Sequence, residues 1–198
     1  MAVVSKETKV LKPEKFKKKF SVNQFVKMYQ SGIFKSDEKI ELLNGEVFKS
    51  TPMDLKHVLV VDKLTKILSE ILLSDDELKD KYILRVQNPV YLSKDSLPEP
   101  DLSIVSSEYL KENRFPKPKD TALIIEVSDS TLQKDKEIKL PLYAKAKIKE
   151  VWIVDLNKKH IEVYKKSFKN EYLEVKIKPV EKDITIFNKK IHVKEILE

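Results

Sequence analysis

One segment of the chain, Ala122-Leu-Ile-Ile-Glu-Val127, is continuously apolar except for a single carboxylate. A short run of this kind predicts a central strand covered on both faces, because a strand with one face in water alternates apolar and polar side chains. The carboxylate of Glu126 is costly to bury there unless it binds a cation or forms an ion pair. The segment therefore predicts a layered α/β protein, with Glu126 as a metal ligand or as half of a buried ion pair with a lysine.

Three helices are expected around this strand. Ser21 is a suitable N-cap for a short helix, and Asp54 is one for a longer helix that runs to about Leu73. A third helix is expected over 132–146. Pro141 should kink or restart this helix, because a proline inside a helix removes one hydrogen bond and clashes with the preceding turn.

The expected strands begin with a hairpin over 40–48, in which Asn44-Gly45 is a strong two-residue turn signal. Apolar runs bounded by turn residues predict the other strands, at 82–92, 102–105, 122–127, 151–155, 161–164, 172–177, 184–187 and 191–193. Together they predict a mixed sheet with the long helix on one side and the third helix on the other. The hairpin and the last strands would be additions to this sheet.

The chain length of 198 residues fits one domain, which we expect over 20–198, preceded by a basic arm over 1–19. No apolar run approaches the roughly 18 residues that cross a bilayer, and the basic N-terminus is not followed by an apolar stretch. The absence of cysteine excludes disulfides and thiolate metal sites. These features predict a cytoplasmic protein without a membrane partner.

The net charge of +7 is concentrated in two stretches. Residues 1–19 hold seven lysines against two acidic residues, and residues 134–149 hold six lysines against two. The first stretch is equally consistent with a solvated tail. Because Arg85 and Arg114 are the only arginines, the composition favours contact with a phosphate backbone over reading of base edges. The lysines expected to contact a nucleic acid are Lys134, Lys136, Lys145 and Lys147.

Several catalytic machineries are excluded by composition. Gly32 and Gly45 are the only glycines, so a phosphate-binding loop, a dinucleotide-binding loop and a serine-nucleophile elbow are all impossible. The three histidines are far apart in sequence, and no two lie one helical turn apart to hold zinc. The remaining candidates for chemistry are carboxylates, lysines and a single histidine.

Asp101 and Glu126 are the carboxylates best placed to bind a metal. Asp101 follows Pro100 and opens an apolar strand, and Glu126 lies near the end of the most apolar segment. Carboxylates at adjacent strand ends, with the backbone carbonyl of Val127, would be oxygen ligands suited to Mg²⁺ or Mn²⁺. The alternative for Asp101 is a plain turn, since Pro-Asp pairs often begin one.

The order of these elements resembles the PD-(D/E)XK nuclease core, and the chain is similar to the Uma2 group of restriction-endonuclease-like proteins, also called DUF820. This resemblance covers about residues 20–165. It implies a restriction-endonuclease-like fold and Mg²⁺- or Mn²⁺-dependent hydrolysis of phosphodiester bonds in DNA. The matching segments are Glu41-Leu-Leu-Asn-Gly-Glu46, His57, Gln87-Asn-Pro-Val90, Pro100-Asp101, Ile125-Glu-Val-Ser128, Asp135 with Lys139 and Tyr143-Ala144, and Val151-Trp-Ile-Val-Asp155.

The chain departs from the general nuclease pattern at Ser128, where a lysine usually follows the glutamate by two positions. The resemblance implies that this lysine has moved to the following helix, where Lys139 is the matching position. Asp135, Lys139 and Tyr143 are spaced by four and share a helix face if Pro141 does not break the register. The alternative is that Lys139 is an ordinary surface lysine in a lysine-rich stretch.

Three further residues are possible members of the site. Glu46 could add a third carboxylate or be a solvated strand end. His57 could contact phosphate or a metal-bound water, or be a satisfied, partly buried histidine. Gln87 could orient a water molecule or fill a structural hydrogen bond. Two other functions stay open: a catalytically inactive nuclease fold that binds DNA or acts as a scaffold, and a homodimer built on surface ion pairs.

Overall fold

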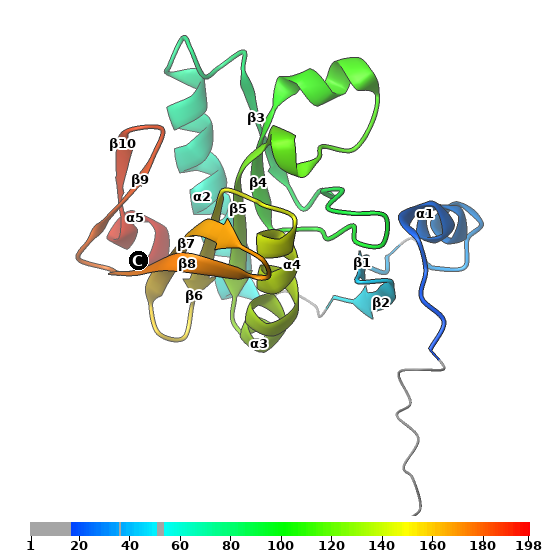
Figure 1. The fold of residues 1–198 in the computed structure, drawn as a ribbon. Coiled ribbons are helices and arrows are strands. Elements are labelled where there is room, and N and C mark those ends of the chain that lie inside the picture. The colour runs from blue at the N-terminus through cyan, green and yellow to red at the C-terminus, as the bar shows by residue number, and fades with distance from the viewer. Residues whose placement is uncertain (1–16, 36, 51–53) are drawn as a thin grey trace, which may run out of the picture.

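The computed structural model describes residues 17–35, 37–50 and 54–198. Its centre is a six-stranded mixed sheet in the order β3-β4-β5-β6-β7-β8 (Figure 1). Neighbouring strands are antiparallel except for β5 and β6, which are parallel. The strands are β3 (Tyr82–Val86), β4 (Leu102–Ser106), β5 (Thr121–Ser128), β6 (Glu150–Asp155), β7 (His160–Phe168) and β8 (Glu171–Pro179).

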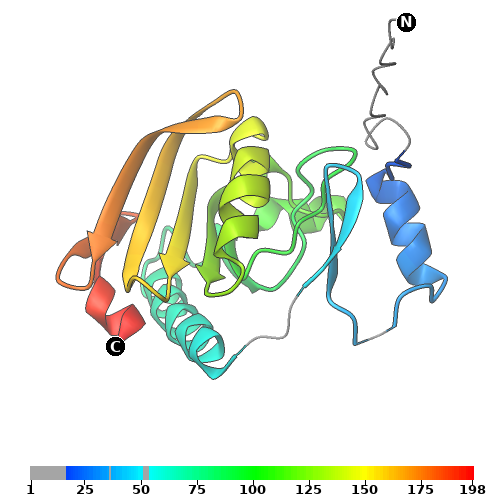
Figure 2. The same ribbon diagram turned by 90° about the horizontal axis from the view of Figure 1, so that it is seen from below.

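Helices cover both faces of this sheet, as the sequence predicts. Helix α2 (Leu55–Leu73) and the C-terminal helix α5 (Val193–Leu197) lie on one face, and α4 (Leu140–Lys145) lies on the other (Figure 2). Strand β5 supplies Ile125 and Val127 to the core under α2, and Ile124 to the core under α4. The apolar segment around Glu126 is therefore buried on both faces, which is the reason for its composition.

Helix α2 begins where its sequence places a cap. The Asp54 side chain accepts a hydrogen bond from the backbone N–H of His57 at 2.8 Å, which satisfies one of the donors left free in a first turn. Val61, Leu64 and Leu68 recur at helical spacing and are buried against the sheet. This packing fixes the N-terminal end of α2, and with it His57, beside the end of β5.

The connection between the parallel strands β5 and β6 is a helical segment with one irregular turn. It consists of α3 (Leu132–Lys134), a π-helical turn η4 (Asp135–Lys139) and α4. In the wide turn the N–H of Leu140 bonds the carbonyl of Asp135, five residues back. Pro141 follows directly and lacks the N–H that a regular helix would use, so the wide turn accommodates the predicted disturbance without breaking the helix.

The N-terminal part packs beside the sheet around a small core of its own (Figure 2). It contains helix α1 (Val22–Gln30), which begins with the expected cap at Ser21, and the antiparallel hairpin β1 (Ile40–Leu43) and β2 (Glu46–Lys49). At the tip of the hairpin Asn44 and Gly45 have φ values of 51° and 81°, as the Asn-Gly turn requires. The buried strand β1 carries Glu41 toward the main sheet.

The structure corrects several predicted boundaries. The strand expected over 82–92 ends at Val86, because Gln87 has a φ of 49° and Pro89 cannot donate to a ladder. The last strand expected over 191–193 instead belongs to a hairpin of β9 (Asp183–Ile186) and β10 (Lys189–His192), and Val193 begins α5. Helix α5 and two 3₁₀ helices, η2 (Ser107–Glu112) and η3 (Pro118–Asp120), are not predicted from the sequence.

Most of the basic arm expected over 1–19 lies outside the described residues, which begin at Lys17. Within the described part of the chain, no helix is both long and apolar enough to cross a membrane.

Candidate active site

The antiparallel register of β4 and β5 brings two predicted carboxylates together. Leu102 pairs with Ile125, so Asp101, one position earlier, lies across from Glu126. The Asp101 carboxylate accepts a hydrogen bond from the backbone N–H of Val127 through Oδ2, at 2.8 Å. An antiparallel pair places the start of one strand beside the end of the next, which explains how residues 25 positions apart in sequence become neighbours.

Glu126 points from β5 toward the helix on the α4 face and meets two donors there. Lys139 Nζ lies 2.6 Å from Glu126 Oε1, and the Tyr143 hydroxyl donates to the same oxygen at 2.5 Å. All three side chains are buried. Lys139 and Tyr143 are spaced by four on one helix face, so both side chains reach the same oxygen.

Glu41 is a member of the site that is absent from the predicted residues. Its carboxylate lies 2.8 Å from Lys134 Nζ and 3.5 Å from Lys139 Nζ, and it accepts the backbone N–H of Glu99 at 3.2 Å. Glu41 is 2% exposed in a strand of four buried residues. A carboxylate inside the apolar run Ile-Glu-Leu-Leu is the same signal that marks Glu126, and it could have been recognised in the sequence.

Asp101 is held from a second side by His57. His57 Nε2 lies 3.2 Å from Asp101 Oδ1, while His57 Nδ1 is buried without a hydrogen-bond partner among the described residues. Burial lowers the pKa of His57, but the carboxylates of Asp101 and Asp54 outweigh burial and the pKa is raised. With Val127 and His57 as partners, both oxygens of Asp101 are fixed in orientation.

Asp135 closes the site on the helix side and engages the residue that replaces the usual lysine. The hydroxyls of Ser128 and Thr131 both donate to Asp135 Oδ2, at 2.9 and 2.7 Å. Ser128 therefore anchors the start of the helix instead of supplying a cation.

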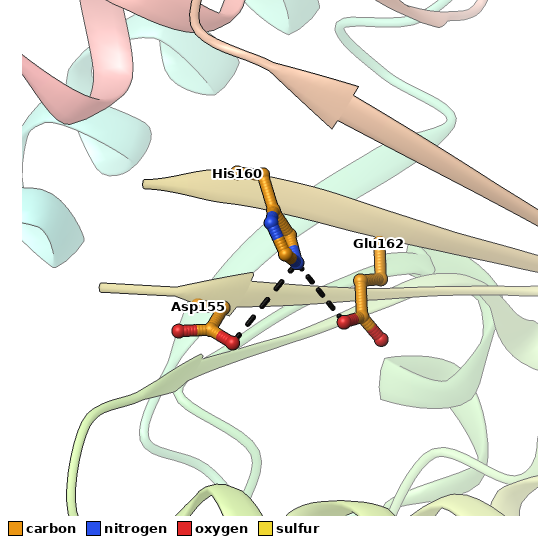
Figure 3. Close-up of side chains that lie close together, drawn as sticks. All are labelled: Asp155, His160 and Glu162. Atoms are coloured by element: carbon orange, nitrogen blue, oxygen red, sulfur yellow. Dashed lines mark hydrogen bonds and ion pairs between the residues drawn. The ribbon is translucent and has the colours of Figure 1, made fainter. Parts of the chain in front are cut away.

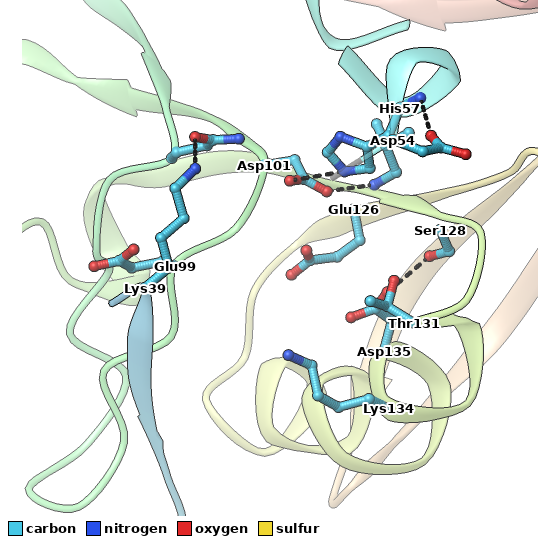
Figure 4. A network of polar contacts seen from close by, with 12 residues as sticks. Lys39, Asp54, His57, Glu99, Asp101, Glu126, Ser128, Thr131, Lys134 and Asp135 are labelled. Atoms are coloured by element: carbon cyan, nitrogen blue, oxygen red, sulfur yellow. Dashed lines mark hydrogen bonds and ion pairs between the residues drawn. The ribbon is translucent and has the colours of Figure 1, made fainter. Parts of the chain in front are cut away.

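Apart from the fully buried Tyr143 and Ser128, these side chains line one cleft where β4 begins and β5 ends (Figure 4). Seven carboxylates face it, against three lysines and one histidine. Burial, with the neighbouring Asp135 and Asp101, outweighs the opposing effect of Lys139 and raises the pKa of Glu126 to about 8. The cleft lining comprises Lys39, Glu41, Ser50, Asp54, His57, Gln87, Glu99, Asp101, Glu126, Asp129, Ser130, Thr131, Lys134, Asp135 and Lys139.

The proton affinity of Lys139 is raised as well. Burial lowers the pKa of Lys139, but the carboxylates of Glu126 and Glu41 outweigh burial, so the pKa is raised above its ordinary value. An acid and a base that both hold their protons more tightly than usual indicate an excess of negative charge around them.

The other predicted residues lie at different distances from this cleft. Gln87 lines it and accepts a hydrogen bond from Lys39 at 2.6 Å. Glu46 does not line it and instead faces Lys17 at 3.8 Å on the hairpin. Lys136 does not line it and instead pairs with Glu162 of β7. Lys145 and Lys147 follow at the end of α4 and are not part of the lining.

The sheet defines the class of the protein. A six-stranded mixed sheet flanked by helices gives this chain a restriction-endonuclease-like α/β fold. The chain belongs to the Uma2 family, described as "Putative restriction endonuclease", whose model matches residues 22–188. This membership supports a nuclease at the general level.

A solved structure has the same fold. It is that of "a putative nuclease belonging to DUF820" from Anabaena variabilis ATCC 29413, with a TM-score of 0.69 and 12% sequence identity. The likeness covers 90% of this chain and 97% of that one. A search of curated proteins found no match.

Proposed function

We propose that this protein is a metal-dependent endonuclease that hydrolyses phosphodiester bonds of DNA in the cleft beside β5. The observation that carries the proposal is the meeting of Asp101, Glu126 and Lys139. The lysine is absent from its usual place at Ser128, yet an ammonium group from a separate helix lies 2.6 Å from the Glu126 carboxylate. Acidic metal ligands beside a fixed cation suit hydrolysis of a phosphodiester, and these residues would supply both.

The donors in the cleft fit a hard divalent cation. The ligands would be the carboxylates of Asp101 and Glu126 and the backbone carbonyl of Val127, all of them oxygens, as Mg²⁺ and Mn²⁺ prefer. The excess of carboxylates over lysines in the lining is the charge that such an ion would neutralise. When bound, Mg²⁺ or Mn²⁺ would polarise the phosphate and activate water for attack.

The protein's own residues orient these ligands and supply a second cation. Tyr143 and Lys139 both donate to Oε1 of Glu126, so the carboxylate is held in one orientation. His57 and the N–H of Val127 hold Asp101 in the same way. The ammonium group of Lys139, kept charged by the surrounding carboxylates, would stabilise negative charge that develops on the phosphate.

Binding of the DNA backbone would depend on the lysines around the cleft. Lys134 lines the cleft, and we include Lys136, Lys145 and Lys147 as outer contacts on the same helical segment. Because the cleft itself is negative, a phosphate would be repelled until a divalent ion is present. DNA binding should therefore require a divalent ion and should weaken with salt.

The test is a cleavage assay on circular double-stranded DNA, circular single-stranded DNA and RNA, with and without Mg²⁺ or Mn²⁺. Cleavage of DNA should depend on the ion and should be lost in Asp101→Asn and Glu126→Gln. Glu46→Gln is the matched control, because this carboxylate lies outside the cleft, and it should cleave like the wild type. Cleavage that survives Asp101→Asn, or that needs no ion, contradicts the proposal.

One observation favours the alternative of an inactive nuclease fold that binds DNA. Lys139 is already engaged by Glu126 and Glu41, and a lysine held only as a structural counterion would serve no reaction. In that case Ca²⁺ would support DNA binding that Asp101→Asn abolishes, while no ion would support cleavage.

A further inference from the structure

A second polar cluster lies on the same sheet face as Glu126, two strands further along. Asp155 ends β6, and His160 and Glu162 lie in β7, where Asp155 pairs with His160 in the ladder (Figure 3). The three ligand atoms lie within 4.8 Å of one another. Among the residues that the structure describes, no other group of three histidine or acidic side chains has its ligand atoms this close together.

The distances within the cluster match the edges of a metal coordination shell. His160 Nε2 lies 3.0 Å from Glu162 Oε1 and 4.0 Å from Asp155 Oδ2. Ligands bound tetrahedrally to Zn²⁺ at about 2.1 Å are about 3.4 Å apart, a value between these two distances. Small rotations of the side chains would therefore place all three atoms around one ion.

An unsatisfied oxygen points into the cluster. Asp155 is fully buried, and its Oδ2 accepts no hydrogen bond from the described residues. Its other oxygen accepts the backbone N–H groups of Asn157 and Lys158, at 3.1 and 2.9 Å. These bonds hold the carboxylate so that Oδ2 faces His160 (Figure 3). A buried carboxylate oxygen without a partner is costly, and a cation would remove that cost.

The other acidic ligand is also held in place by its neighbours. The Tyr164 hydroxyl donates to Oε2 of Glu162 and leaves Oε1 directed toward His160. Outer partners of this kind orient metal-binding carboxylates in known sites. Lys136 Nζ contacts Oε1 of Glu162 at 2.7 Å, but its side chain is 30% exposed and can withdraw into water.

We propose that Asp155, His160 and Glu162 form a binding site for a transition-metal ion of the Zn²⁺ type, and that metal binding releases Lys136 from Glu162. One nitrogen and two carboxylate oxygens suit Zn²⁺ better than Mg²⁺, which prefers oxygen ligands and octahedral geometry. With three protein ligands, a fourth position is left for water. The site is separate from the proposed catalytic cleft, whose lining does not include these residues.

The test is calorimetric titration of the metal-free full-length protein with Zn²⁺, in excess Mg²⁺ to fill the catalytic cleft. His160→Ala should weaken Zn²⁺ binding by at least about 100-fold, beyond the tenfold to 100-fold typical for loss of an outer partner. Lys136→Met, which removes the competing ammonium group, should tighten it by about threefold or more. Circular dichroism checks that each variant is folded.

A cleft variant separates this proposal from the proposed function. Asp101→Asn should leave Zn²⁺ binding unchanged, whatever its effect on cleavage. Loss of Zn²⁺ binding in Asp101→Asn would place the ion at His57 and overturn the second site. The site is also refuted if His160→Ala binds Zn²⁺ as the wild type does, or if Lys136→Met fails to bind it more tightly. Lys136→Met keeps the test decisive even if His160→Ala does not fold.

Discussion

The cleft beside Glu126 and the cluster around Glu162 lie on one face of the same sheet, and one helical segment supplies a lysine to each. Lys139 contacts Glu126 at 2.6 Å and has a side chain 4% exposed, whereas Lys136 contacts Glu162 at 2.7 Å and has a side chain 30% exposed. The two distances are nearly equal, but only one of the lysines is enclosed by the protein.

The pKa values of the two carboxylates, Glu126 and Glu162, are shifted in opposite directions. Burial is the largest influence on both, and it raises the pKa of Glu126 to about 8. At Glu162 burial is outweighed by Lys136, Tyr164 and His160, and the pKa is lowered. An ion-pair distance alone therefore does not define the role of a lysine. We expect an enclosed lysine to be a permanent part of its site and an exposed one to be replaceable.

The largest difference between Lys139 and Lys136 is expected when each is replaced and DNA cleavage is measured. Lys139→Ala should reduce the rate by about 100-fold or more, the scale for removal of one preorganised electrostatic group. Lys136→Ala should lose only a small factor through weaker DNA binding. Lys139→Arg keeps the charge and controls for misfolding caused by an uncompensated buried Glu126. Equal small losses in both alanine variants would show that Lys139 is only part of a basic surface.

The second difference concerns the pH dependence of metal binding in the cleft. Glu126 keeps its proton up to about pH 8, and an ion must displace that proton. Affinity for Mn²⁺ should therefore fall as the pH drops below 8, by about 50-fold between pH 8 and pH 6. Calorimetry in buffers of different ionisation enthalpy should detect about one proton released near pH 7. An affinity that is the same at pH 6 and pH 8 rules this out.

A pair of tyrosines allows the same comparison in terms of stability. Tyr143→Phe removes a donor from the fully buried Glu126 and should cost about 1–3 kcal/mol in the free energy of unfolding. Tyr164→Phe removes a donor from Glu162, which keeps Lys136 and His160, and should cost about 0.5–1.5 kcal/mol. Urea denaturation measures both. A larger loss of stability in Tyr164→Phe than in Tyr143→Phe would contradict the view that Glu126 depends more on its tyrosine than Glu162 does.

The smallest effect is expected from the charged N-terminal arm, none of whose residues is proposed as a member of either site. Deletion of residues 1–16 removes four lysines and two acidic residues. The salt dependence of DNA binding should fall by about 0.9 in slope for each lysine that contacts phosphate. Metal binding at both sites should not change. An unchanged slope identifies the arm as a solubilising tail.

The fold could be predicted from the sequence because its main signals are local. The apolar segment of β5, the Asp54 cap and the Asn-Gly turn each require one structure for reasons contained in a few residues. Where tertiary contacts determine the backbone conformation, the local sequence does not predict it. The left-handed conformation of Gln87, which ends β3, and the short helix α5, which packs on α2, are of this kind.

For the candidate site, the sequence indicated which residues belong to it better than it indicated which side chains contact one another. Asp101, Glu126 and Lys139 were selected from local pattern and resemblance, and the structure places all three in one cleft. Glu41 was missed in favour of Glu46, five positions later, although its place in the buried run Ile-Glu-Leu-Leu is the same signal that marks Glu126. The cluster of Asp155, His160 and Glu162 depends on the register between β6 and β7, which no spacing along the chain reveals.

The wide turn η4 has a consequence for the angular phase of its helix. Over the eight positions from Asp135 to Tyr143 a continuous α-helix drifts by about 80° from two full turns. A turn that absorbs one extra residue reduces the drift to about 20° in the opposite sense, so both side chains face β5. The alignment of Asp135, Lys139 and Tyr143 is thus a property of seven helical steps made with eight residues. A regular helix that kept all eight residues would rotate the two ends of this polar row apart by about 100°, whereas deleting Ile138 would restore a regular helix and leave the two ends in phase.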